Sequence, residues 1–293
     1  MRSRPKEWRA GERVVLNFTA SDGASIAFQD SGSGRPLVLL HGLMAHSGFF
    51  AAQRELESEF RLIAIDFRGH GKSDTRAPTV EQLARDVEAL ADSLQLDGAV
   101  GVGWSLGASV LWKVLARPSG TRFAGAVVVD MTPRVLNRDG WDLGLSAEAC
   151  EARRLAIRDD FPAMAQAAGQ AIFAQPVRED LQDTAAWAGD EFARNDSAGI
   201  GELWDSLVEQ DFRGVLGKIR QPTLVIHGAH SQLYGPGTAD YLATALPNAR
   251  AVQFDRSGHA PHLEQPELFN RTIRSFAASL PRATQTYETI SQI

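Results

Sequence analysis

The chain has 293 residues, of which 44% are hydrophobic and 23% charged, and its formal net charge is −6. This length and composition are typical of a globular protein that buries a substantial core in one large domain or two small ones. The mild negative charge argues against a nucleic-acid partner, which favours a basic protein face. The single cysteine, Cys150, excludes an internal disulfide and fits a reducing compartment.

The apolar residues predict neither a secretory signal nor a membrane span. No apolar run follows the charged residues of the N-terminal segment 1–15. Elsewhere no stretch approaches the ~20 apolar residues that cross a bilayer. We therefore expect a cytoplasmic protein with no membrane partner.

Hydrophobic patterning predicts strands and helices that alternate along the chain. Residues 37–40 and 123–129 are continuous apolar runs, as in strands buried on both faces. Residues 80–96 have apolar side chains at helical spacing. The predicted order is strands at 14–20, 24–29 and 37–40, a helix at 50–57, a strand at 61–66, a helix at 80–96, a strand at 99–103, a helix at 106–116, a strand at 123–129, a strand at 223–227, a helix at 237–246, a strand at 251–254 and a helix at 266–280. This order predicts a mostly parallel sheet with helices on both faces.

The alternation stops between residues 134 and 215, where the sequence is helical in character. The simplest account is one α/β domain with a helical insertion after its sixth strand. We expect residues 1–133 and 216–293 to form the α/β domain and residues 134–215 to form the insertion.

Residues 101–108 read Gly-Val-Gly-Trp-Ser-Leu-Gly-Ala, a G-x-S-x-G motif between a predicted strand and a predicted helix. The glycines at 103 and 107 leave room for the very tight turn that this context requires. Such a turn exposes Ser105 at a helix N-terminus, where negative charge is favoured. We predict that Ser105 is a nucleophile, rather than an incidental serine in a glycine-rich turn.

A serine nucleophile needs two backbone donors for the oxyanion of its tetrahedral intermediate. We expect the N–H of Leu106, directly after the nucleophile, and the N–H of Leu43, in the loop after the third strand. His41 in that loop is expected to bond backbone beneath the site. Trp104 and Met44 are expected to border the substrate pocket, although inward burial explains Trp104 equally well.

The general base is predicted to be His259, in the loop Ser-Gly-His that follows the strand at 251–254. His262 is the rival, but it lacks the glycine-flanked loop. The spacing of His227 with His230, and of His259 with His262, raises a metal site. Neither pair lies on a predicted helix and no Glu or Cys completes a site, so no metal is predicted.

Four phrases, HGLMAHS, DFRGHGKSD, GWSLG and SGHAPHLEQPELF, resemble the α/β-hydrolase superfamily in its usual order. The resemblance covers nearly the whole chain. It implies an eight-stranded α/β-hydrolase fold, with the insertion at 134–215 as the helical cap of that family.

The triad acid departs from the family's usual pattern. Most members carry it after strand seven, where this chain has Ser231. Asp130, at the predicted end of strand six, faces the same crevice as the nucleophile. A smaller esterase branch has its acid there, in a similar Asp-Ile-Ser-Pro phrase, so the resemblance implies Asp130 as the acid. A turn or helix-capping role for Asp130 is the alternative reading, and Asp255 is a weaker candidate for the acid.

These residues predict a serine esterase that cleaves small to medium acyl esters, lactones included, through an acyl-enzyme and without a cofactor. Its expected partner is a small-molecule ester, and the oligomeric state stays open, a homodimer included. Acyl transfer, perhydrolysis and carbon–carbon bond hydrolysis would use the same residues. A non-catalytic ligand-binding protein on this fold is the alternative from another class.

Overall fold

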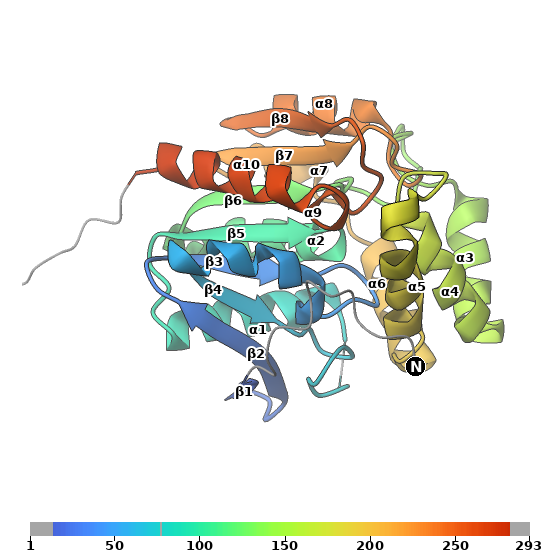
Figure 1. Ribbon diagram of the computed structural model, residues 1–293, viewed down its shortest axis with the longest axis horizontal. Helices are drawn as coiled ribbons and strands as arrows, with labels where there is room; N and C mark the ends of the chain where they lie inside the picture. Colours follow the sequence, from blue (N-terminus) through green and yellow to red (C-terminus); the bar gives the residue numbers. More distant parts are fainter. Residues whose placement is uncertain (1–13, 77, 282–293) are drawn as a thin grey trace, which may run out of the picture.

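The computed structural model describes residues 14–76 and 78–281. Within these residues, eight strands form one sheet in the order β1-β2-β4-β3-β5-β6-β7-β8 (Figure 1). β1 and β2 pair antiparallel with their neighbours, whereas all the pairs from β4 to β8 across the sheet are parallel. The predicted α/β class with a mostly parallel sheet is confirmed.

The bounds of the elements follow the predicted order along the chain. The strands are β1 (Leu16–Thr19), β2 (Ser25–Gly32), β3 (Arg35–Leu40), β4 (Phe60–Ile65), β5 (Ala99–Trp104), β6 (Phe123–Val129), β7 (Thr223–Gly228) and β8 (Ala249–Phe254). The α-helices are α1 (Val80–Ser93), α2 (Leu106–Leu115), α3 (Ala147–Asp159), α4 (Phe161–Ala171), α5 (Gln182–Phe192), α6 (Ser197–Val208), α7 (Arg213–Leu216), α8 (Pro236–Ala245), α9 (Pro261–Glu264) and α10 (Pro266–Ser279), and the 3-10 helices are η2 (Ser47–Ser58), η3 (Pro118–Arg122) and η4 (Glu179–Leu181).

The segment predicted as a helix at 50–57 is the longer 3-10 helix η2. Its backbone leaves helical geometry at Phe50, which divides the segment into two short helices. His46 caps its start, because the Nδ1 atom accepts a hydrogen bond of 3.0 Å from the backbone N–H of Gly48. The apolar spacing identified a helical segment here, and the structure gives it the tighter 3-10 form on both sides of the kink.

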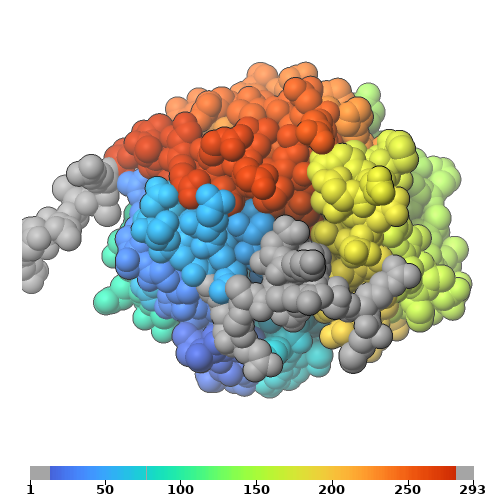
Figure 2. All heavy atoms as spheres, in the orientation of Figure 1, coloured from blue at the N-terminus to red at the C-terminus, as the bar shows by residue number. Residues whose placement is uncertain are grey.

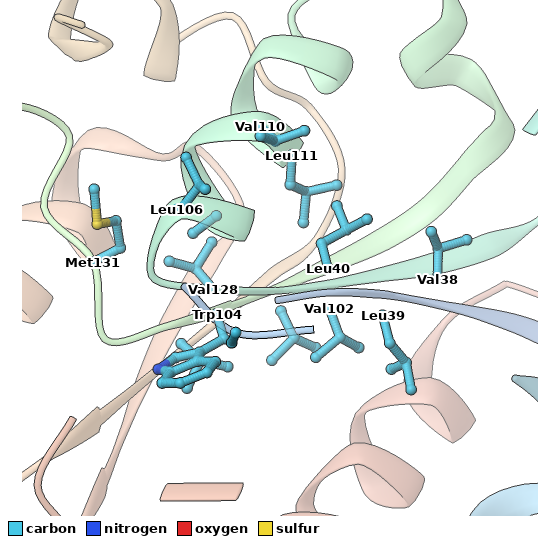
Figure 3. Close-up of a cluster of buried hydrophobic side chains, with 14 of the residues drawn as sticks. Val38, Leu39, Leu40, Val102, Trp104, Leu106, Val110, Leu111, Val128 and Met131 are labelled. Atoms are coloured by element: carbon cyan, nitrogen blue, oxygen red, sulfur yellow. The ribbon is translucent and has the colours of Figure 1, made fainter. Parts of the chain in front are cut away.

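The central strands are apolar throughout because helices cover both faces of the sheet. α1 and α2 lie on one face, and η2 and α10 lie on the other (Figure 1). In Figure 3, Val102 and Trp104 of β5 point to one face, whereas Leu106 and Leu111 of α2 lie on the opposite side of the strand. The alternation places Trp104 at the end of β5 on the α10 side, where its side chain is 1% exposed.

The helices α3 to α6 gather at the end of the sheet toward which the parallel strands point (Figure 1). They come from the chain between β6 and β7, as the helical character of residues 134–215 predicts. In Figure 2, the α5 region (yellow) lies against the C-terminal part of the chain (red). Polar contacts join the segment between β6 and β7 to the rest of the chain. The Ala174 N–H, after α4, donates to Glu264 Oε2 of α9 at 2.8 Å, and Glu191 Oε2 of α5 lies 3.2 Å from His46 Nε2. These helices therefore cover the carboxyl edge of the sheet.

Among the helices of the described residues, none is long and apolar enough to cross a membrane. Most of the N-terminal segment interpreted above, residues 1–13, lies outside the described range.

Candidate active site

Ser105 lies on the tight turn between β5 and α2. Its backbone has φ 52° and ψ −120°, a conformation that residues other than glycine rarely adopt. The turn is possible because the two flanking glycines contact backbone closely. A Cβ atom at Gly103 would lie 2.5 Å from the Gly107 oxygen, and a Cβ atom at Gly107 would lie 2.1 Å from the Leu40 oxygen. The sequence thus folds locally into the turn that the G-x-S-x-G motif predicts.

His259 and Asp130 form a buried pair. The Nδ1 atom of His259 lies 2.6 Å from Asp130 Oδ2, and both side chains are at most 3% exposed. Asp130 directly follows β6 and has φ 46°. Its Oδ2 also accepts a hydrogen bond of 2.7 Å from Ser231 Oγ, in the loop after β7, and its Oδ1 accepts one of 3.3 Å from the N–H of Gly228, the last residue of β7.

Ser231 therefore has a function that the sequence did not reveal. It occupies the position where most of the resembled family has its acid, and its hydroxyl donates to the carboxylate of Asp130, which directly follows β6. The departure at position 231 was visible in the sequence. The bond itself was not, because it joins two loops that are 101 residues apart in the chain.

The loop that carries His259 is held by two side chains, Trp104 and Glu264. The indole N–H of Trp104 donates to the His259 backbone oxygen at 2.8 Å. Glu264 Oε1 accepts the Gly258 N–H at 2.6 Å, while its Oε2 accepts the Ala174 N–H from the segment after α4. Burial raises the pKa of Glu264 to about 7. Glu264 was missed from the sequence, although it belongs to the quoted phrase SGHAPHLEQPELF.

The rivals considered for the base and the acid lie elsewhere. His262 is fully buried between aromatic rings, 4.6 Å from Trp104 and 5.2 Å from Phe50 between centroids, and neither of its ring nitrogens has a hydrogen-bond partner in the described residues. Burial lowers its pKa to about 3. Asp255 is exposed and accepts a hydrogen bond from Gln253.

The two backbone N–H groups expected for the oxyanion come from the loop after β3, at Leu43, and from the first residue of α2, Leu106. The N–H groups of Leu43 and Leu106 donate to no protein acceptor within the described chain. Met44 follows with φ 66°, and its N–H donates to His70 Nε2 at 3.0 Å. Its oxygen accepts a hydrogen bond of 2.7 Å from Asn195 Nδ2, which lies between α5 and α6. The loop is thus held in place while two amides stay available.

Two neutral histidines support this loop from below. The Phe67 N–H donates to His41 Nε2 at 2.9 Å, so the ring proton of His41 lies on Nδ1, which donates to the Gly42 oxygen at 2.8 Å. In the same way, His70 accepts at Nε2 and donates from Nδ1 to the Arg68 oxygen. Burial lowers the pKa of His41 well below its usual value and that of His70 to about 4. Both rings therefore bond backbone and stay uncharged at neutral pH.

A pocket opens at Ser105 and His259, with about 470 Å³ of empty space when its open mouth is included. Both residues predicted to border it, Trp104 and Met44, line it. The remaining lining is mostly apolar or small, and one cation contributes. These residues are Gly42, Leu43, Arg153, Ala168, Ala171, Ile172, Phe192 and Leu233. Over residues 14–76 and 78–281, no three His, Cys, Asp or Glu side chains form a group that could hold a metal ion.

The family profile described as the alpha/beta hydrolase fold matches residues 35–266. The chain belongs to the α/β-hydrolase fold family. The match confirms the family that the four sequence phrases resemble, and it spans every residue of the candidate site.

Named relatives within the α/β-hydrolase family are similar over most of the chain. A pimeloyl-[acyl-carrier protein] methyl ester esterase of Nitrosomonas europaea is 33% identical over 84% of this chain and 97% of its own length. A non-heme chloroperoxidase of Streptomyces lividans is 31% identical over 89% of this chain and 99% of its own. The solved structure of an esterase from Exiguobacterium antarcticum superposes with a TM-score of 0.85 at 28% identity, covering 91% of this chain and all of that one.

Proposed function

We propose that this α/β-hydrolase is a carboxylic ester hydrolase that acts on small to medium acyl esters, lactones included. The observation that carries the proposal is the 2.6 Å contact between His259 and Asp130 beside a serine on a strained strand-to-helix turn. The esterase names of two of the relatives support the same reaction class. The single cysteine, Cys150, is buried and unbonded, which fits the cytoplasmic location that we propose with it.

In this mechanism, Ser105 attacks the ester carbonyl while its proton passes to Nε2 of His259. Asp130 accepts the Nδ1 proton of His259, which fixes the tautomer that can take the serine proton and stabilises the imidazolium that forms. The N–H groups of Leu43 and Leu106 donate to the oxyanion. His259 then protonates the leaving alcohol, and water cleaves the acyl-enzyme by the same route.

We also propose that the chain is divided as its sequence suggests. Residues 1–133 and 216–293 would form the catalytic core, and residues 134–215 a cap that shapes the pocket. Support comes from the lining of the pocket, to which α4 and α5 contribute Ala168, Ala171 and Phe192. A cap in this position excludes water from the reacting carbonyl and selects the acyl or alcohol group.

The test is the hydrolysis of a p-nitrophenyl ester series of increasing acyl length by the wild type and the Ser105→Ala variant. Because Ser105 supplies the nucleophile, its loss should lower kcat by on the order of 10⁴–10⁶. Ser109→Ala is the matched control: Ser109 lies one turn further along α2, and its buried hydroxyl has no hydrogen-bond partner in the described residues. Equal activity of Ser105→Ala and wild type would refute the proposal.

A second reaction deserves a test in the same assay, since one relative is named a non-heme chloroperoxidase. In perhydrolysis, hydrogen peroxide replaces water as the nucleophile that cleaves the acyl-enzyme, and the product is a peracid. Peracid formation that depends on Ser105 would favour this activity over simple ester hydrolysis.

A further inference from the structure

A single cation faces the pocket among its described lining residues. Arg153 lies on the first helix of the insertion, α3, and lines the same pocket as Ser105 and His259. The rest of the lining is apolar apart from the reacting residues and small glycine and alanine positions. An arginine in such surroundings offers a positive charge and several N–H donors to an anionic ligand.

Arg153 differs from every other partly or fully buried arginine in the described chain, because its guanidinium makes no hydrogen bond and has no carboxylate within 4.0 Å. Arg35 bonds backbone oxygens. All the others are ion-paired, namely Arg54, Arg61, Arg68, Arg117, Arg122, Arg134, Arg178, Arg213 and Arg274. A partly buried charge without a partner is costly, and proteins retain such features mainly at functional sites.

The neighbours of Arg153 hold its guanidinium without neutralising it. Its Cζ atom lies over the ring of Trp204, 5.2 Å from the ring centroid, and this cation–π contact helps to hold the guanidinium in place. The other groups that act on it electrostatically are Tyr234 and Cys150, and burial lowers the pKa of Arg153 from its usual value. Burial also raises the pKa of both the Tyr234 hydroxyl and the Cys150 thiol, so both stay uncharged at neutral pH.

The next residue in the chain offers a matched comparison. Arg154 is exposed and pairs with Glu151 Oε2 at 3.1 Å on the outside of α3. The two arginines share a helix and a charge, but only Arg153 faces the pocket.

We propose that Arg153 binds a carboxylate of the substrate, so that the preferred ester is one that carries a carboxylate in addition to its scissile bond. The inference rests on the proposed ester hydrolysis and names its substrate class. A guanidinium presents two parallel N–H groups that match the two oxygens of a carboxylate, and the mostly apolar pocket around them favours that small planar anion. The substrate then supplies the negative charge that the protein does not.

The test compares charged with uncharged esters of equal length. In the first set, the carboxylate lies on the acyl side: monomethyl esters of straight-chain dicarboxylic acids from succinate to suberate, against their dimethyl esters. In the second set, it lies on the alcohol side: O-acetyl hydroxy acids, against acetate esters of the matching alcohols. The value of kcat/KM is measured by pH-stat titration for the wild type, Arg153→Met, Arg153→Lys and Arg154→Met.

We expect the wild type to prefer the charged ester in one of the two sets by roughly tenfold to hundredfold, the range of a charge-assisted hydrogen bond. Arg153→Met should lose this preference while it still cleaves uncharged esters. Arg153→Lys should keep part of it, and Arg154→Met all of it. The set that shows the preference tells which side of the ester carries the carboxylate.

Two results would overturn the inference while leaving ester hydrolysis intact: Ser105-dependent cleavage of uncharged esters without a charge preference in either set, or a preference that survives in Arg153→Met. A binding measurement keeps the test independent of turnover. Calorimetry with free dicarboxylates should detect binding to Ser105→Ala and weaker binding to Ser105→Ala/Arg153→Met. Equal binding, or none, counts against Arg153 whether or not esters are cleaved.

Discussion

The carboxylate of Asp130 is surrounded by donors from two separate segments: Gly228 at the end of β7 with Ser231 in the loop after it, and His259 in the loop after β8. Each donor reduces the cost of burying the charge. The position of Asp130 at the end of β6, next to β7 in the sheet, makes this possible. The Asp130 carboxylate thus reaches His259 across one strand, and Ser231 lies where most of the resembled family has its acid.

Replacing Asp130 by Asn should lower kcat for ester hydrolysis by on the order of 10³–10⁴. The amide keeps the shape and tolerates the left-handed backbone at this position. It can donate to His259 Nδ1, however, which leaves the proton on Nε2 and prevents that atom from accepting the serine proton. The measurement is steady-state kinetics with a p-nitrophenyl ester. Asp255→Asn is the control, since this carboxylate is exposed, and it should stay within about twofold of wild type.

A second change makes the same experiment more specific. Because Ser231 Oγ lies 2.7 Å from the carboxylate, an aspartate at position 231 reaches the same region. The kcat of the double variant Asp130→Asn/Ser231→Asp should therefore be at least about tenfold higher than that of Asp130→Asn. An Asp130→Asn enzyme as active as wild type would show that the acid has no part in the reaction.

At the residue scale, the sequence suggested roles where a local motif or a departure from it points to the chemistry. Ser105 and His259 lie in recognisable turns, and Asp130 was proposed because position 231 lacks a carboxylate. The structure brings His259 and Asp130 into contact, and their roles in the reaction stay predictions. Ser231 and Glu264 were not assigned roles, because their hydrogen bonds depend on how distant loops meet. Arg153 was not distinguished from Arg154 either, since the sequence does not show which side of α3 faces the pocket.

At the scale of elements, β5, the turn at Ser105 and α2 form one rigid unit with β3. Gly107, the second residue of α2, lies so close to β3 that an added Cβ would be 2.1 Å from the Leu40 oxygen and 2.9 Å from the His41 oxygen. Both obstacles are backbone atoms of the sheet and its following loop. The helix can approach the strand only because this position has no Cβ.

Gly107→Ala should therefore destabilise the protein by about 1–3 kcal/mol or more, because the helix must move away from the strand. Activity should fall as well, since the movement displaces both Ser105 and the loop that carries Leu43. Urea denaturation gives the free energy of unfolding. Gly214→Ala, in α7, is the control: nothing lies within 4 Å of its added Cβ, so this change should be neutral or slightly stabilising. Equal stability of the two variants would contradict the packing argument.

Most elements could be predicted to within a few residues, because continuous apolar runs and helical spacing are strong local signals. The central strands and α2 are examples. Neither the 3-10 form of η2 nor its kink at Phe50 was predicted, since neither leaves a mark in the spacing of apolar residues. The position of α3 to α6 over the pocket could not be predicted either. It depends on contacts between distant segments, such as the hydrogen bond from Asn195 to the Met44 oxygen.

For the whole molecule, the buried histidines His41, His70 and His262 link stability to pH. In the unfolded chain such imidazoles take up protons near pH 6.5. In the folded protein, burial lowers the pKa of His70 to about 4 and that of His262 to about 3, and His41 is lowered too. Between these values the unfolded state binds more protons, so the free energy of unfolding falls as the pH falls. Glu264, with its pKa raised to about 7, acts in the opposite direction and offsets part of this loss.

His262 allows this acid sensitivity to be tested at a residue that has no proposed part in the reaction. Its ring lies among those of Phe50, Trp104 and Phe269, and neither nitrogen has a hydrogen-bond partner in the described residues. His262→Phe removes the group that must take up a proton and suits the aromatic surroundings. Between pH 7 and pH 4 the free energy of unfolding should fall by about 3 kcal/mol less in the variant than in the wild type. The reason is that, below pH 6.5, the unfolded wild type binds a proton at His262 that the folded protein does not, which lowers its stability by about 1.4 kcal/mol per pH unit. Urea denaturation at several pH values measures the difference. His230→Gln, at an exposed position, should follow the wild type, and an equal acid loss in His262→Phe and wild type would show that His262 does not titrate as its burial requires.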